Sequence, residues 1–425
     1  MKSTFTRNPW KAIAFLTVVI SMFSCTACDP DLNLKPQVTI GTTQNVSQTA
    51  ATLVASVIPN GDNVIVSFEY QANNSAWKSQ TLSGKLSGDI AIKVTLDLSD
   101  LQPSTLYNFK VTAGSVTSSV SSFTTKGLTL AVIKIKSAEN VKINTASLSA
   151  SVIPNQDNTS ISFEYRTLNA TWISKSLGST FSGSDSVKVN LDLSDLQFNT
   201  LYNFRVKVTN NAGEVLSDVI PFTTYAVSDY DGNLYHSVTI GKQTWLQENF
   251  RGTHYANGDP IANETNPDTW STLTTGAYCW YNNDPELGKV YGGLYNWYVG
   301  ADPRGLIIGW YTPTGYEQAD LMNNFNDWLT AGLSVMESGN AHWVNTKYTA
   351  TNSTGFTALP NGGLVLDEET QKSSFIALHA SASFWSSTNR GATADATIIQ
   401  SYNCGFGVGA VFNKNNAFSL RLLKN

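Results

Sequence analysis

Residues that could hold a ligand gather in the C-terminal part of this 425-residue chain. From Tyr225 to Asn425 the sequence contains eight of the eleven Trp, thirteen of the seventeen Tyr and all four His. Aromatic faces stack on the apolar face of a sugar ring, and amide and carboxylate oxygens hydrogen-bond its hydroxyls. Two loops and two further aromatic positions give these ligand-binding candidates: Trp270, Trp280, Tyr281, Asn282, Asn283, Asp284, His342, Trp343, Asn345 and Tyr348. The alternative for each of them is a packing role in the core.

The same region contains no pattern that is typical of catalysis. The four His are scattered, without the spacing of a metal-binding pair. No Gly-x-Ser-x-Gly elbow occurs, and no two carboxylates stand out as a glycosidase pair. The sequence therefore predicts a protein that is not an enzyme and that uses no cofactor and no metal.

One acidic segment, Asp229-x-Asp231-Gly232-Asn233, is similar to the beginning of a calcium-binding loop. Such a loop ends in a bidentate Glu at its twelfth position, and that position is Ile240 here. The segment therefore favours a tight turn between two strands, with Asp-Gly at its centre.

The overall charge bears on the class of partner. The formal net charge is −5, and charged residues make up 14% of the chain. Nucleic-acid binding would require a basic patch, so this composition excludes that class and suits an uncharged or weakly charged partner.

Residues 1–28 have the features of an export signal. Lys2, Arg7 and Lys11 precede an apolar run over residues 12–23, which is too short to span a bilayer. The small residues that follow resemble a bacterial lipobox, in which a Cys is lipidated. We expect the lipid on Cys28, with Cys25 as the alternative, because Ala27 precedes Cys28 and acidic residues follow it. The protein would be exported and anchored to the outer membrane by this lipid alone, facing outward; the other interpretation is an ordinary signal peptide with incidental cysteines.

An internal repeat follows, with copies at residues 38–125 and 133–224. The offset is 95 residues, and it becomes 99 after an insertion near 210–213, where a hairpin turn is expected. Alternating Val, Ile, Thr and Ser predict short strands in each copy. The segment Leu101-x-Pro103-x-Thr105-x-Tyr107-x-Phe109 resembles the end of a fibronectin type III domain, a β-sandwich. The resemblance implies that Tyr107 and Tyr202 bond to nearby backbone and that the copies serve as spacers.

The last domain, residues 226–425, resembles the Fibrobacter succinogenes major paralogous domain family. The motifs that carry this resemblance are, in order, Asp229–Tyr235, Ile240–Asn249, Trp280–Asp284, Tyr291–Tyr298, Ala350–Pro360, Phe384–Thr388 and Phe418–Arg421. The resemblance implies an exported protein and a C-type-lectin-like fold. The expected fold class is therefore mainly β with an α+β C-terminal domain: two fibronectin-type-III-like sandwiches followed by a lectin-like domain.

The chain departs from this family at two cysteine positions. Ile307 and Leu422 stand where the family usually has a cysteine pair, which implies a buried apolar contact in place of a disulfide. Cys279 and Cys404 lie elsewhere and are either a different bridge, which the exported compartment permits, or two buried free thiols.

One helix can be predicted in this domain from local signals. Thr314-x-x-Glu317 resembles a capping box, Leu321, Phe325, Trp328 and Leu329 fall on one helix face, and Gly332 is a plausible stop.

Together these observations predict a non-catalytic cell-surface lipoprotein. Its lectin-like domain would bind a glycan or a surface protein. The alternative is a structural or assembly subunit of a surface appendage or coat.

Overall fold

The computed structural model describes residues 34–425 except 62, 368 and 371. The predicted lipid-carrying residues, Cys28 and Cys25, lie outside the described residues. The chain divides into two compact units, one ending at Leu128 and the other beginning at Thr129. Among the described residues, no helix has the length and apolar character needed to cross a membrane.

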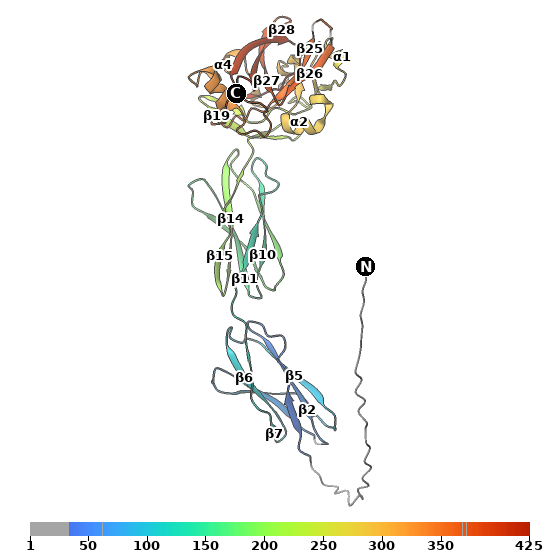
Figure 1. The fold of residues 1–425 in the computed structure, drawn as a ribbon, viewed down its shortest axis with the longest axis vertical. Helices are drawn as coiled ribbons and strands as arrows, with labels where there is room; N and C mark the ends of the chain where they lie inside the picture. Colours follow the sequence, from blue (N-terminus) through green and yellow to red (C-terminus); the bar gives the residue numbers. More distant parts are fainter. Residues whose placement is uncertain (1–33, 62, 368, 371) are drawn as a thin grey trace, which may run out of the picture. The chain divides into compact units, whose positions relative to one another are not determined.

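The first repeat copy forms two antiparallel sheets with a shared core (Figure 1). Its strands are β1 (Gln37–Ile40), β2 (Ala51–Ile58), β3 (Val66–Ala72), β4 (Lys78–Thr81), β5 (Ile92–Leu98), β6 (Leu106–Ala113), β7 (Val116–Thr117) and β8 (Ser121–Thr124). One sheet has the order β1-β2-β5, and the other has the order β4-β3-β6-β7, with β8 also paired to β6. Buried residues alternate along β5 and β6, as period-two spacing requires when one face of each sheet is covered.

The second copy repeats this arrangement. Its strands are β9 (Val132–Ile135), β10 (Ala146–Ile153), β11 (Thr159–Thr167), β12 (Ile173–Phe181), β13 (Val187–Leu193), β14 (Leu201–Asn210), β15 (Gly213–Leu216) and β16 (Ile220–Thr223). β14 has ten residues against eight in β6, and β15 has four against two in β7. The four extra residues therefore lengthen one hairpin, whose turn lies between Asn210 and Gly213 as predicted.

The two predicted tyrosine corners are confirmed. The hydroxyl oxygen of Tyr107 accepts a hydrogen bond from the backbone N–H of Gln102 at 2.9 Å. In the second copy, Tyr202 accepts from the N–H of Gln197 at the same distance. Both rings are buried, so each bond satisfies a backbone donor at the edge of a core.

The C-terminal domain combines short strands with five short α-helices and one 3₁₀ helix, η1, among the described residues (Figure 1). The helical segments are α1 (Pro267–Trp270), η1 (Tyr281–Asn283), α2 (Pro285–Tyr291), α3 (Trp297–Gly300), α4 (Gly315–Met322) and α5 (Trp328–Val335). The early strands are β17 (Val227–Ser228), β18 (Leu234–Tyr235), β19 (Ser237–Ile240), β20 (Gln243–Leu246), β21 (Ala262–Asn263), β22 (Ala277–Cys279), β23 (Leu294–Tyr295) and β24 (Trp310–Tyr311). The late strands are β25 (Asn361–Asp367), β26 (Lys372–Leu378), β27 (Ser381–Arg390), β28 (Thr393–Gln400), β29 (Phe406–Asn413) and β30 (Leu423–Lys424).

The end of the chain returns to the start of this domain. β30 lies between β20 and β24 in a four-stranded sheet, with Trp245 opposite Leu423 and Tyr311 opposite Leu423 on the other side. This pairing brings the segments around Ile307 and Leu422 together, and both side chains are buried in the same apolar cluster. Both side chains are therefore buried as expected. That they touch each other directly, in place of the family's disulfide, stays a prediction.

Cys279 and Cys404 are both buried free thiols, which excludes a bridge between them. They belong to different apolar clusters, one beside Trp270 and the other beside Trp343. Burial raises the pKa of the Cys279 thiol, so this side chain behaves as a small apolar residue.

The predicted single helix is wrong in its extent, although its beginning is right. Thr314 and Glu317 form the expected capping box at the start of α4. The helix then ends at Met322, and Asp327 caps a second helix, α5, by accepting a hydrogen bond from the N–H of Thr330. Gly332 lies inside α5, where a Cβ would overlap the carbonyl oxygen of Cys404. Close packing against another segment, and not helix termination, accounts for that glycine.

The tyrosine corner of the first copy gives a stability prediction. Tyr107→Phe removes the acceptor of the Gln102 N–H and keeps the ring, so it should lower the free energy of unfolding of this sandwich by about 1 kcal/mol. Urea denaturation of the chain would measure the loss. Tyr70→Phe, on neighbouring β3, is the matched control, because no hydrogen bond of its hydroxyl occurs among the described residues. Equal stability of the two variants would contradict the corner's role.

Candidate functional site

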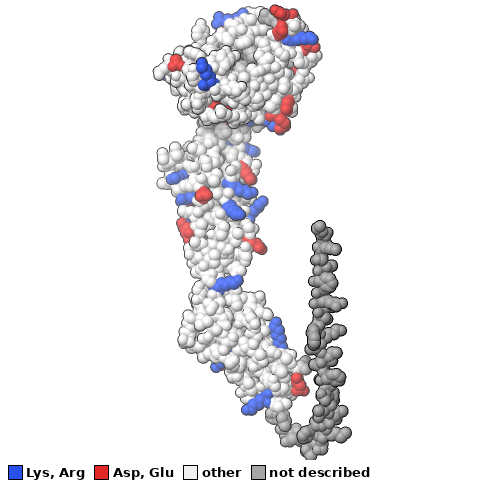
Figure 2. Space-filling model, in the orientation of Figure 1, with Lys and Arg blue, Asp and Glu red and all other residues white. Residues whose placement is uncertain are grey.

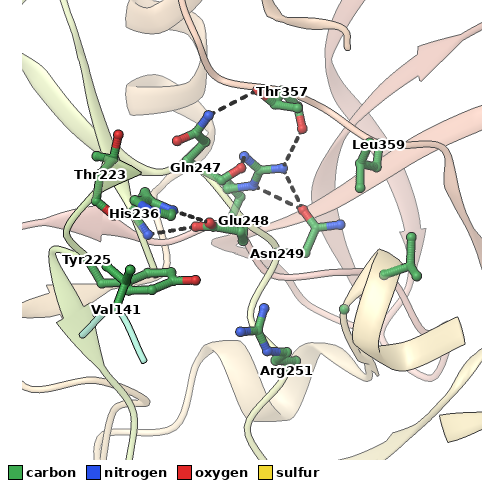
Figure 3. A pocket seen from close by; sticks show the side chains of 13 residues that line it. Val141, Thr223, Tyr225, His236, Gln247, Glu248, Asn249, Arg251, Thr357 and Leu359 are labelled. Atoms are coloured by element: carbon green, nitrogen blue, oxygen red, sulfur yellow. Dashed lines mark hydrogen bonds and ion pairs between the residues drawn. The ribbon is translucent and has the colours of Figure 1, made fainter. Parts of the chain in front are cut away.

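A cavity of about 520 Å³ lies where the second sandwich meets the C-terminal domain (Figure 3). Its walls come from both. The sandwich and its exit contribute Val141, Thr223 and Tyr225; the C-terminal domain contributes His236, Gln247, Glu248, Asn249, Arg251, Val290, Gly292, Thr357, Leu359 and Arg421. A volume of this size is typical of small-molecule sites in proteins.

The contact between the two domains is held by a reciprocal amide lock. The Asn199 side chain donates to the carbonyl oxygen of Ser237 at 3.0 Å and accepts from the Ser237 N–H at 2.9 Å. Nearby, the Lys424 ammonium lies 5.9 Å from the ring centre of Phe198. These contacts fix the sandwich beside β19 and β30, and thereby fix the two sides of the cavity.

The contact residues of the second copy differ from their counterparts in the first. The repeat offset aligns Phe198 with Pro103, Asn199 with Ser104, and Tyr225 with Lys126. The backbone at these positions is the same, since Ser104 N–H donates to Lys126 O at 3.1 Å and Asn199 N–H donates to Tyr225 O at 3.0 Å. The side chains alone have changed, and all three now face the C-terminal domain. We expected both copies to serve as spacers and did not predict that the second copy contacts the C-terminal domain and lines a cavity.

His236 and Glu248 form an ion-pairing unit on one side of the cavity. His236 Nδ1 lies 2.7 Å from one Glu248 carboxylate oxygen, and the His236 backbone N–H donates to the other at 2.8 Å. The Tyr225 ring stacks against the imidazole, with 4.1 Å between ring centres. Because the carboxylate holds one ring nitrogen and Tyr225 covers one face, the imidazole has a single orientation (Figure 3).

Arg251 is placed by the hairpin of β17 and β18. Its guanidinium donates to Leu234 O at 3.0 Å and lies 5.0 Å from the ring centre of Tyr235. The Tyr235 hydroxyl in turn donates to Asp229 at 2.7 Å, and burial raises its pKa well above the usual value. Asp229 also accepts from the N–H and the side-chain amide of Asn233, so the predicted tight turn is confirmed. The acidic segment therefore supports the site by positioning Arg251.

Arg421 closes the inner end of the cavity as a fully buried cation. Its guanidinium donates to the side-chain oxygen of Asn249 at 2.7 and 3.0 Å, and to backbone carbonyl oxygens of Leu246, Gln247 and Phe356. Burial lowers its pKa to about 9, so it remains charged at neutral pH. Its donors are occupied by these acceptors, which makes Arg421 a structural element of the wall.

The cavity has the chemistry of a binding site. It offers an aromatic face at Tyr225, a cation at Arg251, an amide at Gln247 and apolar surface at Val290 and Leu359. Its lining contains no cysteine or serine, and no hydroxyl side chain bonds the His236 ring among the described residues. The arrangement can hold a polar ligand with an apolar face.

None of the ten candidates predicted from the sequence lines this cavity. Two of them are corrected outright: Trp270 and Trp343 are each only 1% exposed. The Trp270 indole donates to Glu264 O, and the Trp343 indole donates to Ala358 O, at 3.0 Å each. These tryptophans pack in the core, because the apolar indole gains more by burial when its N–H finds a carbonyl.

The Trp280–Asp284 segment builds the fold. Tyr281 is buried against Phe375, and Trp280 packs on Gly288, where a Cβ would overlap the indole. Asn282 and Asn283 occupy the left-handed region, with φ of 52° and 58°, so they form a turn. The Asp284 carboxylate caps α2 by accepting from the Glu286 N–H. This segment therefore contributes to the fold, and ligand contact by its exposed residues Asn282, Asn283 and Asp284 stays a prediction.

The remaining candidates lie on a different surface. His342 is held by Glu337, whose carboxylate oxygen lies 2.7 Å from Nδ1. Asn345 and Tyr348 are exposed on the same loop. This loop remains accessible to a ligand, and so do the exposed residues Asn282, Asn283 and Asp284.

The cavity residues were missed because they belong to segments that the sequence presents as scaffold. Two C-terminal motifs contain or adjoin these residues. His236 directly follows the motif Asp229–Tyr235, and Gln247, Glu248 and Asn249 lie within the motif Ile240–Asn249. One usable signal was present: the repeat offset places Tyr225, Asn199 and Phe198 opposite Lys126, Ser104 and Pro103. These differences between the copies lie at the end of the second sandwich that contacts the C-terminal domain.

Comparison with known proteins finds one family model that matches the C-terminal region. Residues 238–424 match the model of the family described as the Fibrobacter succinogenes major domain. No match was found among curated proteins.

Solved structures resemble parts of the chain. The sensor domain of the anti-sigma factor RsgI4 of Pseudobacteroides cellulosolvens is 22% identical, with 23% of this chain and 99% of that chain covered and a TM-score of 0.20. A segment of two fibronectin type III domains from chicken tenascin is 16% identical, with 44% of this chain and 97% of that chain covered and a TM-score of 0.20.

The amide lock gives a prediction for the junction. Asn199→Ala removes both hydrogen bonds to Ser237 and should cost about 1–2 kcal/mol of local stability. Hydrogen exchange of the Ser237 amide, followed by mass spectrometry, should accelerate, since its acceptor is lost. Asn158→Ala, at an exposed turn of the same sandwich, is the control and should leave this amide protected. Unchanged exchange in Asn199→Ala would show that the lock does not hold the junction.

Proposed function

We propose that this protein is a non-catalytic binding protein of the cell surface, and that its ligand is the end of a glycan held in the cavity between the second sandwich and the C-terminal domain. The observation that carries the proposal is the Tyr225 ring beside polar groups at Gln247 and Arg251 in one preformed cavity. A sugar ring has an apolar face and a polar edge, and this combination of groups matches both.

The low charge of the surface supports an uncharged or weakly charged ligand. Figure 2 shows charged side chains scattered singly or in small groups over the visible face, with large uncharged areas between them. The ion pairs of the domain, such as that of Arg304 with Asp302 at 2.8 Å, are local. A highly charged partner would be matched by a continuous field of one sign, which this face lacks.

We also propose the lectin-like character of the C-terminal domain and the lipid anchor. The lectin-like character is supported by the mixture of short helices and small sheets in this domain, because the loops between them contribute most of the residues that line the cavity. The sequence around Cys28 supports the lipid anchor. In this proposal the lipid holds the protein at the outer membrane, with the binding domain directed outward.

The alternative function is a structural or assembly subunit of a surface appendage or coat. It requires the C-terminal domain to contact other subunits and leaves the cavity without a role. Binding measurements therefore separate the two functions, because only the first predicts that a change in the cavity alters affinity for a sugar.

The binding function is tested with a glycan array and a cavity variant. The full chain without its signal should bind a defined group of glycans, and Tyr225→Ala should weaken that binding about tenfold, since a stacking ring is lost. Isothermal titration with the best glycan would measure the effect.

The matched control is Tyr230→Ala, an exposed tyrosine of the same domain outside the cavity. Both variants should melt within a few degrees of the parent. Binding that survives in Tyr225→Ala would remove the cavity from the proposal, and an array without any bound glycan would favour the assembly function.

The anchor makes a separate prediction. Cys28→Ser should release the protein from the membrane fraction and abolish labelling with palmitate, whereas Cys25→Ser should do neither. Fractionation of cells that express each variant would decide between the two residues. The opposite pattern would assign the lipid to Cys25.

A further inference from the structure

A second surface of the C-terminal domain has features of a binding site, and it lies on the turn Ser401–Gly405. Three aromatic side chains are anchored to this turn and remain well exposed: Trp328 by 50%, Tyr348 by 40% and Tyr402 by 64%. Tyr402 belongs to the turn itself. We call this set the aromatic platform. Large exposed aromatic groups that gather in one place mark interaction sites on folded proteins.

Contacts with the backbone of this turn hold both Trp328 and the loop that carries Tyr348. The Lys347 N–H donates to Ser401 O at 3.0 Å, which holds the Tyr348 loop against the turn. The Cys404 thiol lies 3.2 Å from Ser401 O and 4.0 Å from Tyr348 O. The Trp328 ring covers Gly405, where a Cβ would overlap the indole.

The turn is held rigidly and at a conformational cost. Cys404 has φ of 55°, in the left-handed region that residues other than glycine rarely adopt. Its carbonyl oxygen packs on Gly332 in α5, a position at which any Cβ would overlap it. Such strain persists only where the surroundings enforce it, and it is common where a surface must be preformed for a ligand.

The surroundings of the rings are polar but carry little charge. Asn345 is exposed beside Tyr348, and Asn403 lies within the turn. The Lys347 ammonium lies 5.2 Å from the ring centre of Tyr348, and the Asp327 carboxylate beside Trp328 is occupied by the N–H and hydroxyl of Thr330. Exposed rings with amide side chains on the same segments suit stacking on sugars better than a protein interface, whose centre is a continuous apolar area.

We propose that the aromatic platform is a second glycan-binding surface, and that it takes the extended part of a neutral polysaccharide. The inference rests on the proposed function only for the class of ligand, since the platform shares no residue with the cavity. A preformed surface binds a flexible chain with less loss of side-chain entropy than a mobile one. Two sites on one domain would raise the affinity for long chains over short ones.

The test compares a neutral glucan polymer with its disaccharide, using affinity electrophoresis and titration of the full chain without its signal. The parent should bind the polymer more tightly than the disaccharide. Trp328→Ala and Tyr402→Ala should each weaken polymer binding about tenfold and leave disaccharide binding unchanged. Tyr316→Ala is the matched control, because this tyrosine is exposed on α4 beside Thr388, away from the turn.

Each other outcome has a defined meaning. If the parent binds the polymer no more tightly than the disaccharide, or if the platform variants bind the polymer like the parent, the platform is not a glycan surface. If Trp328→Ala instead abolishes a dimer seen by sedimentation, the surface is a contact between copies and the proposal is overturned. If Tyr225→Ala has no effect while the platform variants lose the polymer, the cavity fails as the proposed site and the platform stands.

Discussion

The C-terminal domain depends on a buried positive charge, that of Arg421, which forms no direct ion pair with a carboxylate among the described residues. Arg421 is fully buried and is held by four backbone carbonyl oxygens and the side-chain oxygen of Asn249. These acceptors come from two segments, around Gln247 and around Phe356, that are more than a hundred residues apart in sequence. A buried cation is costly unless its N–H donors are satisfied, so the acceptors around Arg421 are required for the fold. The chain can therefore satisfy Arg421 only by bringing both segments to the last strand, and this requirement forms the inner wall of the cavity.

The wall of the cavity that the second sandwich contributes has a different origin. It depends on side chains that differ between the two copies of the repeat. Backbone geometry is shared at the corner of each copy, as the paired bonds of Ser104 and Asn199 show. Side chains at the surface of a sandwich contribute little to its own stability, so they are free to change. In the second copy the changes to Asn199 and Tyr225 created a lock and an aromatic face for the neighbouring domain. A few side chains of the second sandwich, which differ from those of the first, therefore join it to the C-terminal domain and complete one wall of the cavity.

The sequence correctly predicted the features that depend on residues close to one another in the chain. The repeat fixed the strands of both sandwiches, including the hairpin that gained four residues, and the Asp229 segment formed the expected turn. The capping box at Thr314 also formed where predicted. Each of these depends on residues within a few positions of one another. The extent of the helix failed, because Gly332 resembles a helix stop locally but serves a contact with Cys404, seventy-two positions later.

Two of the functional candidates, Trp270 and Trp343, were wrong for a similar reason, because both are buried. An aromatic residue in a polar loop looks available in the sequence, but Trp343 is buried because its indole reaches the Ala358 carbonyl across the loop. Conversely, Trp328 looked like core on a helical wheel and is half-exposed, because the helix breaks before it and Gly405 offers backbone for its ring to cover. Exposure of an aromatic ring is thus decided by what lies opposite it in the fold. Where a strained turn and two glycines hold such a ring at the surface, the fold gives up part of the stabilisation that full burial of the ring would contribute. The binding role proposed above for this surface would account for that exposure.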